Sequence, residues 1–192
     1  MESPDPAVLV EAVLLVSGRP IGERALLSAT GLDRDELEQA LSRLAGKYDV
    51  QNSGIVLRQV AGGWQLATNP RCAGAVERFR GEARPAPLSG AAYEVLSCVL
   101  YLGPMTRGAI SSVRGVNSDA VVRHLIERNL LAEVGTDGES PGAPALLDVT
   151  EDFLIATSAE GRGDFTPLEE LVSEEELARV RERLTDRAPG KE

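Results

Sequence analysis

The chain has 192 residues, enough for one large or two small domains, and its 43% hydrophobic content is typical of a soluble globular protein. Only 4% of the residues are aromatic, so the cores must consist mainly of Leu, Val and Ala. The net charge of −10 disfavours a nucleic-acid-binding surface over the whole chain, because phosphate backbones would be repelled. The acidic groups lie mainly in the second half, which suits either a basic protein partner or simple solubility.

The cysteine pattern and the hydropathy indicate a cytoplasmic protein without a membrane span. Cys72 and Cys98 are far apart, and no signal peptide precedes them, which predicts a reducing compartment. The most apolar stretch, 7–16, is shorter than the roughly 20 residues that cross a bilayer, and it contains Glu11. We therefore interpret this stretch as a buried helix.

The first half begins with two predicted helices. Ser3 or Asp5 can cap a helix whose body is 7–16 and which ends at Gly18. A short helix over 22–30 follows. The residues predicted to share its inner face are Ala25, Leu26 and Ala29.

A tight turn at Gly31 leads into a third helix. Asp33 and Glu36 have the spacing of a capping box, in which each side chain accepts a hydrogen bond from the other residue's backbone. The residues of this helix predicted to face inward are Leu37, Ala40, Leu41, Leu44 and Tyr48. Two helices joined by a short turn that contains Gly indicate a helix-turn-helix.

Two β-rich runs, 55–60 and 64–68, flank a Gly-rich turn and predict a hairpin. Helices followed by such a hairpin make a winged helix. A further helix over 70–79 is expected to close this first domain. The Pro-containing, aperiodic stretch that follows is interpreted as a linker.

The second half shows the same order of elements. Its predicted helices are 91–102 capped by Ser89, 107–113 capped by Thr106, and 118–128 capped by Asn117. Strands are predicted over 130–134 and 145–149, with a second wing between them.

The helix-turn-helix is repeated: residues 19–41 align with 103–125 without gaps. The identical pairs are Pro20/Pro104, Ala25/Ala109, Ser28/Ser112, Gly31/Gly115, Asp35/Asp119 and Leu41/Leu125. Gly31 and Gly115 are the turn residues, and Asp33 and Asn117 are the matching caps.

The repeat predicts a mainly α fold with small β-wings (α+β), arranged as two tandem winged-helix domains. The expected domains are 1–80 and 88–158, with a linker over 81–87 and an acidic tail over 159–192. In the tail, Ser173 and Glu176 form a second capping-box pattern. An apolar stripe there consists of Val172, Leu177, Val180 and Leu184. This helix either docks on a partner or on the second domain, or is a frayed terminal helix.

Catalysis leaves little trace in the sequence. His124 is the only histidine, and the phosphate-binding, dinucleotide and nucleophile-elbow motifs are missing, so no catalytic residue, cofactor or metal is expected. On the second helix of each helix-turn-helix, acidic residues accompany the basic ones that could read DNA. The exposed residues are expected to be Arg34, Asp35, Glu38, Gln39, Ser42 and Arg43 in the first copy, and Asp119, Arg123, Glu127 and Arg128 in the second. Protein binding is therefore favoured, and a dimeric DNA-binding regulator is the alternative.

The stretch RGVNSDAVVRHLIERNLL, over 114–131, resembles the bacterial segregation and condensation protein B family, the winged-helix partner of the kleisin in SMC complexes. The segments AVLVEAVLLVSGRPI and VAGGWQLAT resemble the opening helix and first wing of that family. The sequence departs from the family over 143–150, where a run of the type RPxLYxTT is usual.

The resemblance implies a non-catalytic homodimer, assembled mainly through the first domain, that binds the kleisin largely through the second. Such a protein would act on the SMC ATPase ring in the cytoplasm, at the nucleoid, and would meet chromosomal DNA indirectly. The residues assigned on this basis to kleisin binding are Tyr101, Arg107, Arg114, Asn117 and Arg123. Those assigned to the dimer contact are Val8, Leu9 and Val13.

Overall fold

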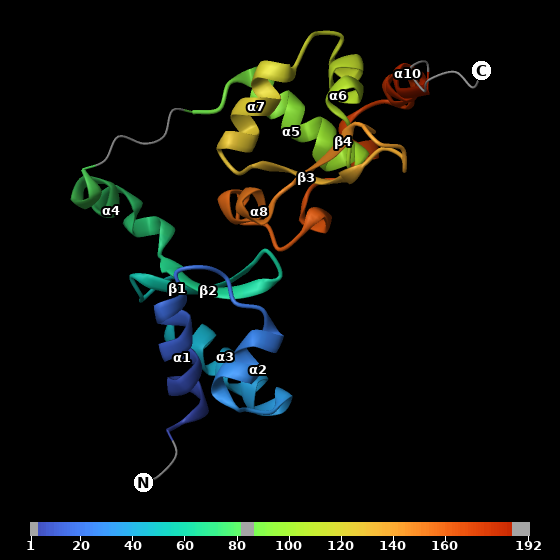
Figure 1. The fold of residues 1–192 in the computed structure, drawn as a ribbon. Coiled ribbons are helices and arrows are strands. Elements are labelled where there is room, and N and C mark those ends of the chain that lie inside the picture. Colours follow the sequence, from blue (N-terminus) through green and yellow to red (C-terminus); the bar gives the residue numbers. More distant parts are fainter. Residues whose placement is uncertain (1–3, 82–86, 186–192) are drawn as a thin grey trace. The chain divides into compact units, whose positions relative to one another are not determined.

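The computed structural model describes residues 4–81 and 87–185 and divides the chain into two compact units. The division falls between Pro85 and Ala86, and Ser158–Gly161 is grouped with the first unit. In each unit, three helices are followed by a two-stranded antiparallel hairpin (Figure 1). The predicted α+β fold with tandem winged helices is therefore confirmed. Most of the predicted linker, 82–86, lies outside the described residues, and the exact domain boundaries stay a prediction.

The first unit contains the two-helix motif and hairpin that the sequence predicts. Its elements are α1 (Pro6–Ser17), α2 (Glu23–Thr30), α3 (Arg34–Lys47), β1 (Ile55–Val60) and β2 (Gly63–Thr68). Ser3 lies outside the described residues, and Asp5 caps α1 by accepting a hydrogen bond from the Ala7 amide at 2.8 Å. The capping box at α3 is present: Asp33 accepts from the Glu36 amide at 2.9 Å, and Glu36 accepts from the Asp33 amide at 3.0 Å.

The core of the first unit lies between α1, α2 and α3. Its buried residues are Ala7, Val10, Leu14, Leu26, Leu37, Ala40, Leu41 and Leu44. The predicted inner face of α3 is confirmed, with Tyr48 half-buried at its end. The predicted inner face of α2 is wrong in part, because Ala25 and Ala29 are exposed. The neighbouring large side chains Leu26 and Leu27 fill the contact with the core and turn the small alanines to solvent.

A backbone bridge holds each hairpin to the segment that precedes its helix-turn-helix. In the first unit, Ile21 and Trp64 exchange two N–H to C=O hydrogen bonds of 2.9 Å each. The equivalent pair in the second unit is Met105 and Leu147, with bonds of 3.0 and 2.8 Å. A Cβ at Gly63 would lie 2.9 Å from the backbone of Ile21, so this position needs a glycine for the close approach of the two chains.

The second unit repeats this arrangement. Its elements are α5 (Gly90–Leu102), α6 (Arg107–Arg114), α7 (Asp119–Glu127), β3 (Leu131–Thr136), β4 (Ala145–Val149) and α8 (Glu151–Thr157). Ser89 and Thr106 cap α5 and α6 as predicted. Helix α7 is shorter than predicted because Ser118 occupies the cap position, although the Asn117 side chain still accepts a hydrogen bond from the Asp119 amide at 2.9 Å.

The segment after the first hairpin differs from the prediction. A 3-10 turn, η1 (Pro70–Cys72), precedes the helix α4 (Ala73–Arg80). The structure describes all of α4, and none of its residues is buried, so α4 does not close the domain. Its only large apolar side chains are Val76 and Phe79, which offer too little apolar surface to hold two helical turns against a core.

The tail contains η2 (Arg162–Asp164), α9 (Leu168–Leu171) and α10 (Glu174–Thr185). The capping box is present, since the Ser173 amide donates to Glu176 at 2.9 Å. Helix α10 packs against α6, and Arg183 donates to the carbonyl of Val113 at 2.9 Å. Val172, Leu177 and Val180 are half-buried, while the Leu184 side chain lies outside the described residues. Of the three alternatives, docking on the second domain is the one observed.

Two carboxylates join α1 to α3. Asp5 accepts two hydrogen bonds from Arg43, at 2.8 and 3.0 Å, and Glu11 accepts from Lys47 at 2.6 Å and from the Tyr48 hydroxyl at 2.7 Å. The Ala7 amide, together with Arg43, holds the pKa of Asp5 below its ordinary value. Lys47 and Tyr48 do the same for the pKa of Glu11. The folded first unit therefore favours the ionised form of both groups.

These lowered pKa values predict acid destabilisation of the first unit. Their contribution to stability is complete above the ordinary carboxyl pKa values, about 4.5 for Glu, and is lost as the pH falls through the lower folded values. We expect Glu11→Gln to lower the melting temperature at pH 7 by about 3 °C and to flatten its fall below pH ~4.5. Fluorescence of Trp64, the only tryptophan, reports melting of this unit.

Glu23→Gln is the matched control, because Glu23 forms an ion pair with Arg34 at 2.8 Å away from α1. A Glu11→Gln protein whose melting temperature has the same pH dependence as the parent would show that this carboxylate does not clamp α1.

Candidate protein-interaction surfaces

The described residues contain no group of three or more His, Cys, Asp or Glu side chains placed to hold a metal ion. His124 is exposed on α7, with its Nδ1 atom 4.0 Å from Glu127. Burial raises the pKa of the Cys98 thiol, which disfavours the reactive thiolate form. None of the helices in the described part of the chain is long and apolar enough to cross a membrane.

Helix α1 is apolar on two opposite sides. Ala7, Val10 and Leu14 face the core of the first unit. On the other side, Val8, Leu15 and Val16 are 57%, 69% and 87% exposed. Together with exposed Ala12 they follow the spacing i, i+4, i+7 and i+8, which forms one stripe along a helix. We name this stripe the outer α1 face; exposed apolar surface of this kind is typical of a protein interface.

The predicted dimer residues fall only partly on this face. Val8 belongs to it, whereas Leu9 and Val13 are half-buried, and Val13 packs against the core. Leu15 and Val16 lie on this face, seven and eight residues after Val8, but were not predicted from the sequence. The stretch is apolar at nearly every position, so its periodicity alone does not separate an inner from an outer side.

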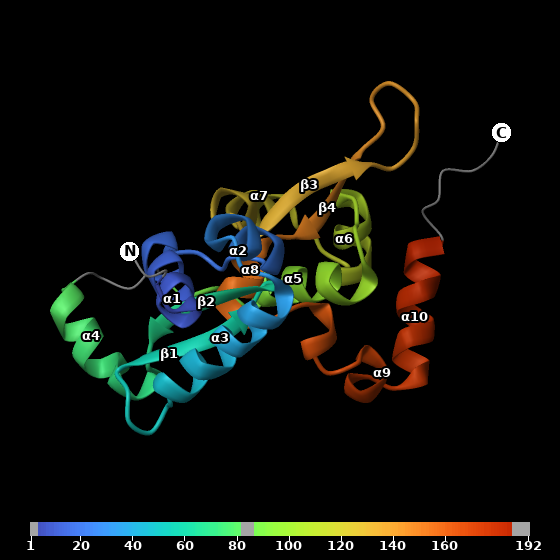
Figure 2. The same cartoon turned by 90° about the horizontal axis from the view of Figure 1, so that it is seen from below.

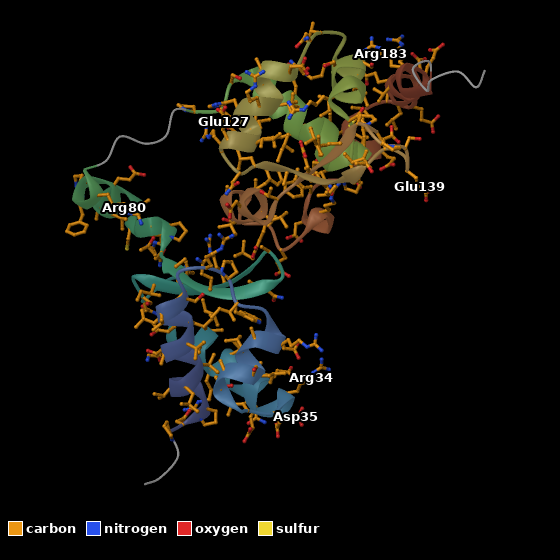
Figure 3. All side chains as sticks on the ribbon, viewed as in Figure 1. Arg34, Asp35, Arg80, Glu127, Glu139 and Arg183 are labelled. Carbon is orange, nitrogen blue, oxygen red and sulfur yellow. The ribbon has the colours of Figure 1, made fainter. Side chains whose placement is uncertain are left out.

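The surfaces that a winged helix would turn toward DNA carry compensated or acidic charge. On α3, Arg34 pairs with Glu23 at 2.8 Å and Arg43 pairs with Asp5 at 2.8 Å. Figure 3 shows Arg34 and Asp35 projecting from the start of α3, and Glu139 at the second wing. Two arginines that could meet phosphates are thus neutralised within the first unit, which disfavours groove insertion.

The second unit has an apolar pocket of about 380 Å³ between α5, α8 and the tail. The residues that shape it include Tyr93, Leu96, Leu100, Tyr101, Phe153 and Phe165. The Phe153 and Phe165 rings stack with centroids 5.8 Å apart, while Tyr93 at the rim is 59% exposed. An apolar hollow with two phenol groups fits an apolar side chain of a protein partner. We name it the α5–α8 pocket.

The structure does not bring the five predicted kleisin-binding residues together. Tyr101 lines the α5–α8 pocket, and the other four are not among its lining residues. Arg107 is half-buried at the start of α6. Asn117 is exposed just before α7, and Arg123 is exposed on α7. Tyr93, which was not predicted as a binding residue, lies eight residues before Tyr101 on α5 and lines the same pocket.

Arg114 has a structural position instead. Its side chain is only 8% exposed, and it donates to Glu94 from Nε at 3.1 Å and from Nη2 at 2.7 Å. Its Nη1 donates to the hydroxyl of buried Ser118 at 2.7 Å. Arg114 thus ties α5 to the turn of the helix-turn-helix, and its assignment to kleisin binding stays a prediction.

Comparisons with known proteins agree on one family. A family model described as segregation and condensation complex subunit ScpB matches residues 8–168. A segregation and condensation protein B from Myxococcus xanthus is 38% identical over 146 residues, which cover 76% of this chain and 44% of that protein. The chain thus spans less than half the length of that relative. One from Desulforamulus reducens is 35% identical over 167 residues, covering 87% of this chain and 91% of that protein.

A crystal structure of ScpB from Mycobacterium tuberculosis is 36% identical and covers 82% of this chain and 98% of that chain, with a TM-score of 0.39. The family assignment rests on the sequence matches. Since the family model covers residues 8–168 and a relative above 30% identity is matched over most of its length, this chain belongs to the ScpB family of segregation and condensation complex subunits.

Proposed function

We propose that this protein is a non-catalytic homodimeric adaptor that binds the kleisin subunit of a bacterial SMC complex. The observation that carries the proposal is that each unit of this ScpB-family chain has an exposed apolar surface that a protein partner could cover. These are the outer α1 face in the first unit and the α5–α8 pocket in the second. One surface suits a second copy of the chain, and the other suits a segment of a different protein.

The outer α1 face supports the homodimer. Two copies can pack this face against each other about a twofold axis, so that the same residues of both copies form the contact. Burying Val8, Leu15 and Val16 of both copies is worth roughly 10 kcal/mol. Association costs a comparable amount in lost freedom of motion, so this face alone supports only a weak dimer, and further contacts are needed.

The α5–α8 pocket supports kleisin binding. Its apolar walls can take a side chain of the kleisin, while the hydroxyls of Tyr93 and Tyr101 can bond to the polar backbone beside it. The acidic second half of the chain favours basic flanking residues in that segment. Contact with chromosomal DNA is then indirect, through the SMC partner, in line with the neutralised arginines of α3.

If the outer α1 face forms the dimer contact, a charge placed on it should strongly weaken self-association. We expect Leu15→Glu to weaken self-association about 100-fold, because two carboxylates would be buried across the twofold axis. Sedimentation equilibrium over a range of concentrations measures this constant. Val134→Glu is the control, since Val134 is similarly exposed, at 56%, on β3 of the second unit. A Leu15→Glu protein that dimerises like the parent would place the dimer contact elsewhere.

If the kleisin binds in the α5–α8 pocket, a substitution at the pocket rim should weaken its binding. We expect Tyr93→Asp to weaken binding of the purified kleisin subunit about 10- to 100-fold in calorimetry, because it removes an aromatic contact and adds a charge. The self-association of this variant should not change. Val116→Asp, at a 54% exposed turn position outside the pocket, is the control. Unchanged kleisin affinity of Tyr93→Asp would rule out the pocket as the binding site.

A further inference from the structure

The first unit also has a hollow, and the proposed function does not use it. It lies between α3 and the hairpin and has a volume of about 560 Å³. Leu37, Leu41, Ala45 and Trp64 provide its apolar lining. We name it the α3–wing groove. It lies where a DNA-binding winged helix would present its reading helix, but its lining suits an apolar side chain.

The edge of the α3–wing groove is acidic. Glu23 and Glu38 line it, and Asp35 lies beside Glu38 in an adjoining hollow. Arg34 also lines the groove, but it is paired with Glu23 at 2.8 Å. Glu38 and Asp35 have no ion-pair partner among the described residues. The occupant that fits best has a large apolar side chain with cationic neighbours.

Helix α4 has these properties. Phe79 is 91% exposed, and the arginines on either side of it, Arg78 and Arg80, are exposed as well. Neither arginine has an ion-pair partner within the described part of the chain. Helix α4 thus presents one large apolar side chain flanked by two cations, which is the composition that the groove and its acidic edge would accept.

The groove of the same copy does not hold this arm. Trp64 lies near the turn of the hairpin, where it pairs with Gln59, whereas α4 follows the opposite end, where Thr68 pairs with Ile55. These ends are roughly 13 Å apart along the strand. Figures 1 and 2 show α4 extending away from α2 and α3, and Figure 3 shows Arg80 on the side of the unit away from Arg34.

We propose that Phe79 of each copy inserts into the α3–wing groove of the other copy in the homodimer. Arg78 and Arg80 then face the free carboxylates Glu38 and Asp35, so the arm and groove match in both apolar character and charge. The inference rests on the proposed homodimer and adds a reciprocal contact to it. By twofold symmetry, each dimer contains this contact twice, which strengthens the weak dimer expected from the outer α1 face alone.

Trp64 provides the test, because it lines the groove and is the only tryptophan of the chain. We expect acrylamide quenching of Trp64 in the full-length protein to fall at least two-fold as the concentration rises through the dimerisation range. Phe79→Ala should remove this protection and weaken self-association about 10-fold or more. Phe79→Leu should restore part of both effects. Val50→Ala, which shortens a 44% exposed apolar residue of the same unit, is the control.

A cross-link between chains tests the contact directly. Both chains carry Cys72→Ser and Cys98→Ser; one adds Ala45→Cys at the groove, and the other adds Arg80→Cys on the arm. After mixing, a short bismaleimide should join the two different chains. Arg80→Cys paired with Val134→Cys in the other chain is the control, because Val134 lies on β3, outside the groove.

The outcomes separate this inference from the proposed function. A wild-type dimer without concentration-dependent protection of Trp64 and without the cross-link would overturn the exchange of arms and leave the homodimer standing. A monomer at all concentrations would overturn both. Protection of Trp64 that appears only when the kleisin is added would assign the groove to that partner and contradict the inference.

Discussion

A short backbone bridge determines the shape of both units. Ile21 and Trp64, and equally Met105 and Leu147, exchange two hydrogen bonds that tie the second hairpin strand to the segment before the helix-turn-helix. A two-stranded hairpin has little stability of its own, so this connection and the packing beneath it hold the wing in place. In the first unit the bridge requires the close approach at Gly63 and places Trp64 at the α3–wing groove.

The size of each unit explains why apolar surface remains exposed. A domain of this length buries a small core, and its first helix is apolar on more sides than that core can cover. Val10 and Leu14 fill the inner side of α1, which leaves Leu15 and Val16 in solvent. An isolated monomer would gain nothing from such a surface. A protein that functions in a complex can use the same helix both for its core and for assembly.

Charge weighs against DNA binding by the first helix-turn-helix and supports the proposed protein-binding function. The helix-turn-helix geometry is retained, but Arg34 and Arg43 are neutralised by Glu23 and Asp5. In the second copy, Arg114 is withdrawn into the domain to hold α5 against the turn. These three arginines therefore form ion pairs within their own units.

The amino-acid sequence by itself determined the features that depend on neighbours along the chain. These are the capping box at Asp33, the turns at Gly31 and Gly115, the two hairpins and the repeat of the helix-turn-helix, since caps and turns need only three or four residues. Only the tertiary structure decided which sides of α1 and α2 are buried. It also decided that α10 packs on α6 while α4 packs on no core. These outcomes depend on contacts between residues far apart in the chain and on how much apolar surface each small core can bury. Local periodicity carries no information about either.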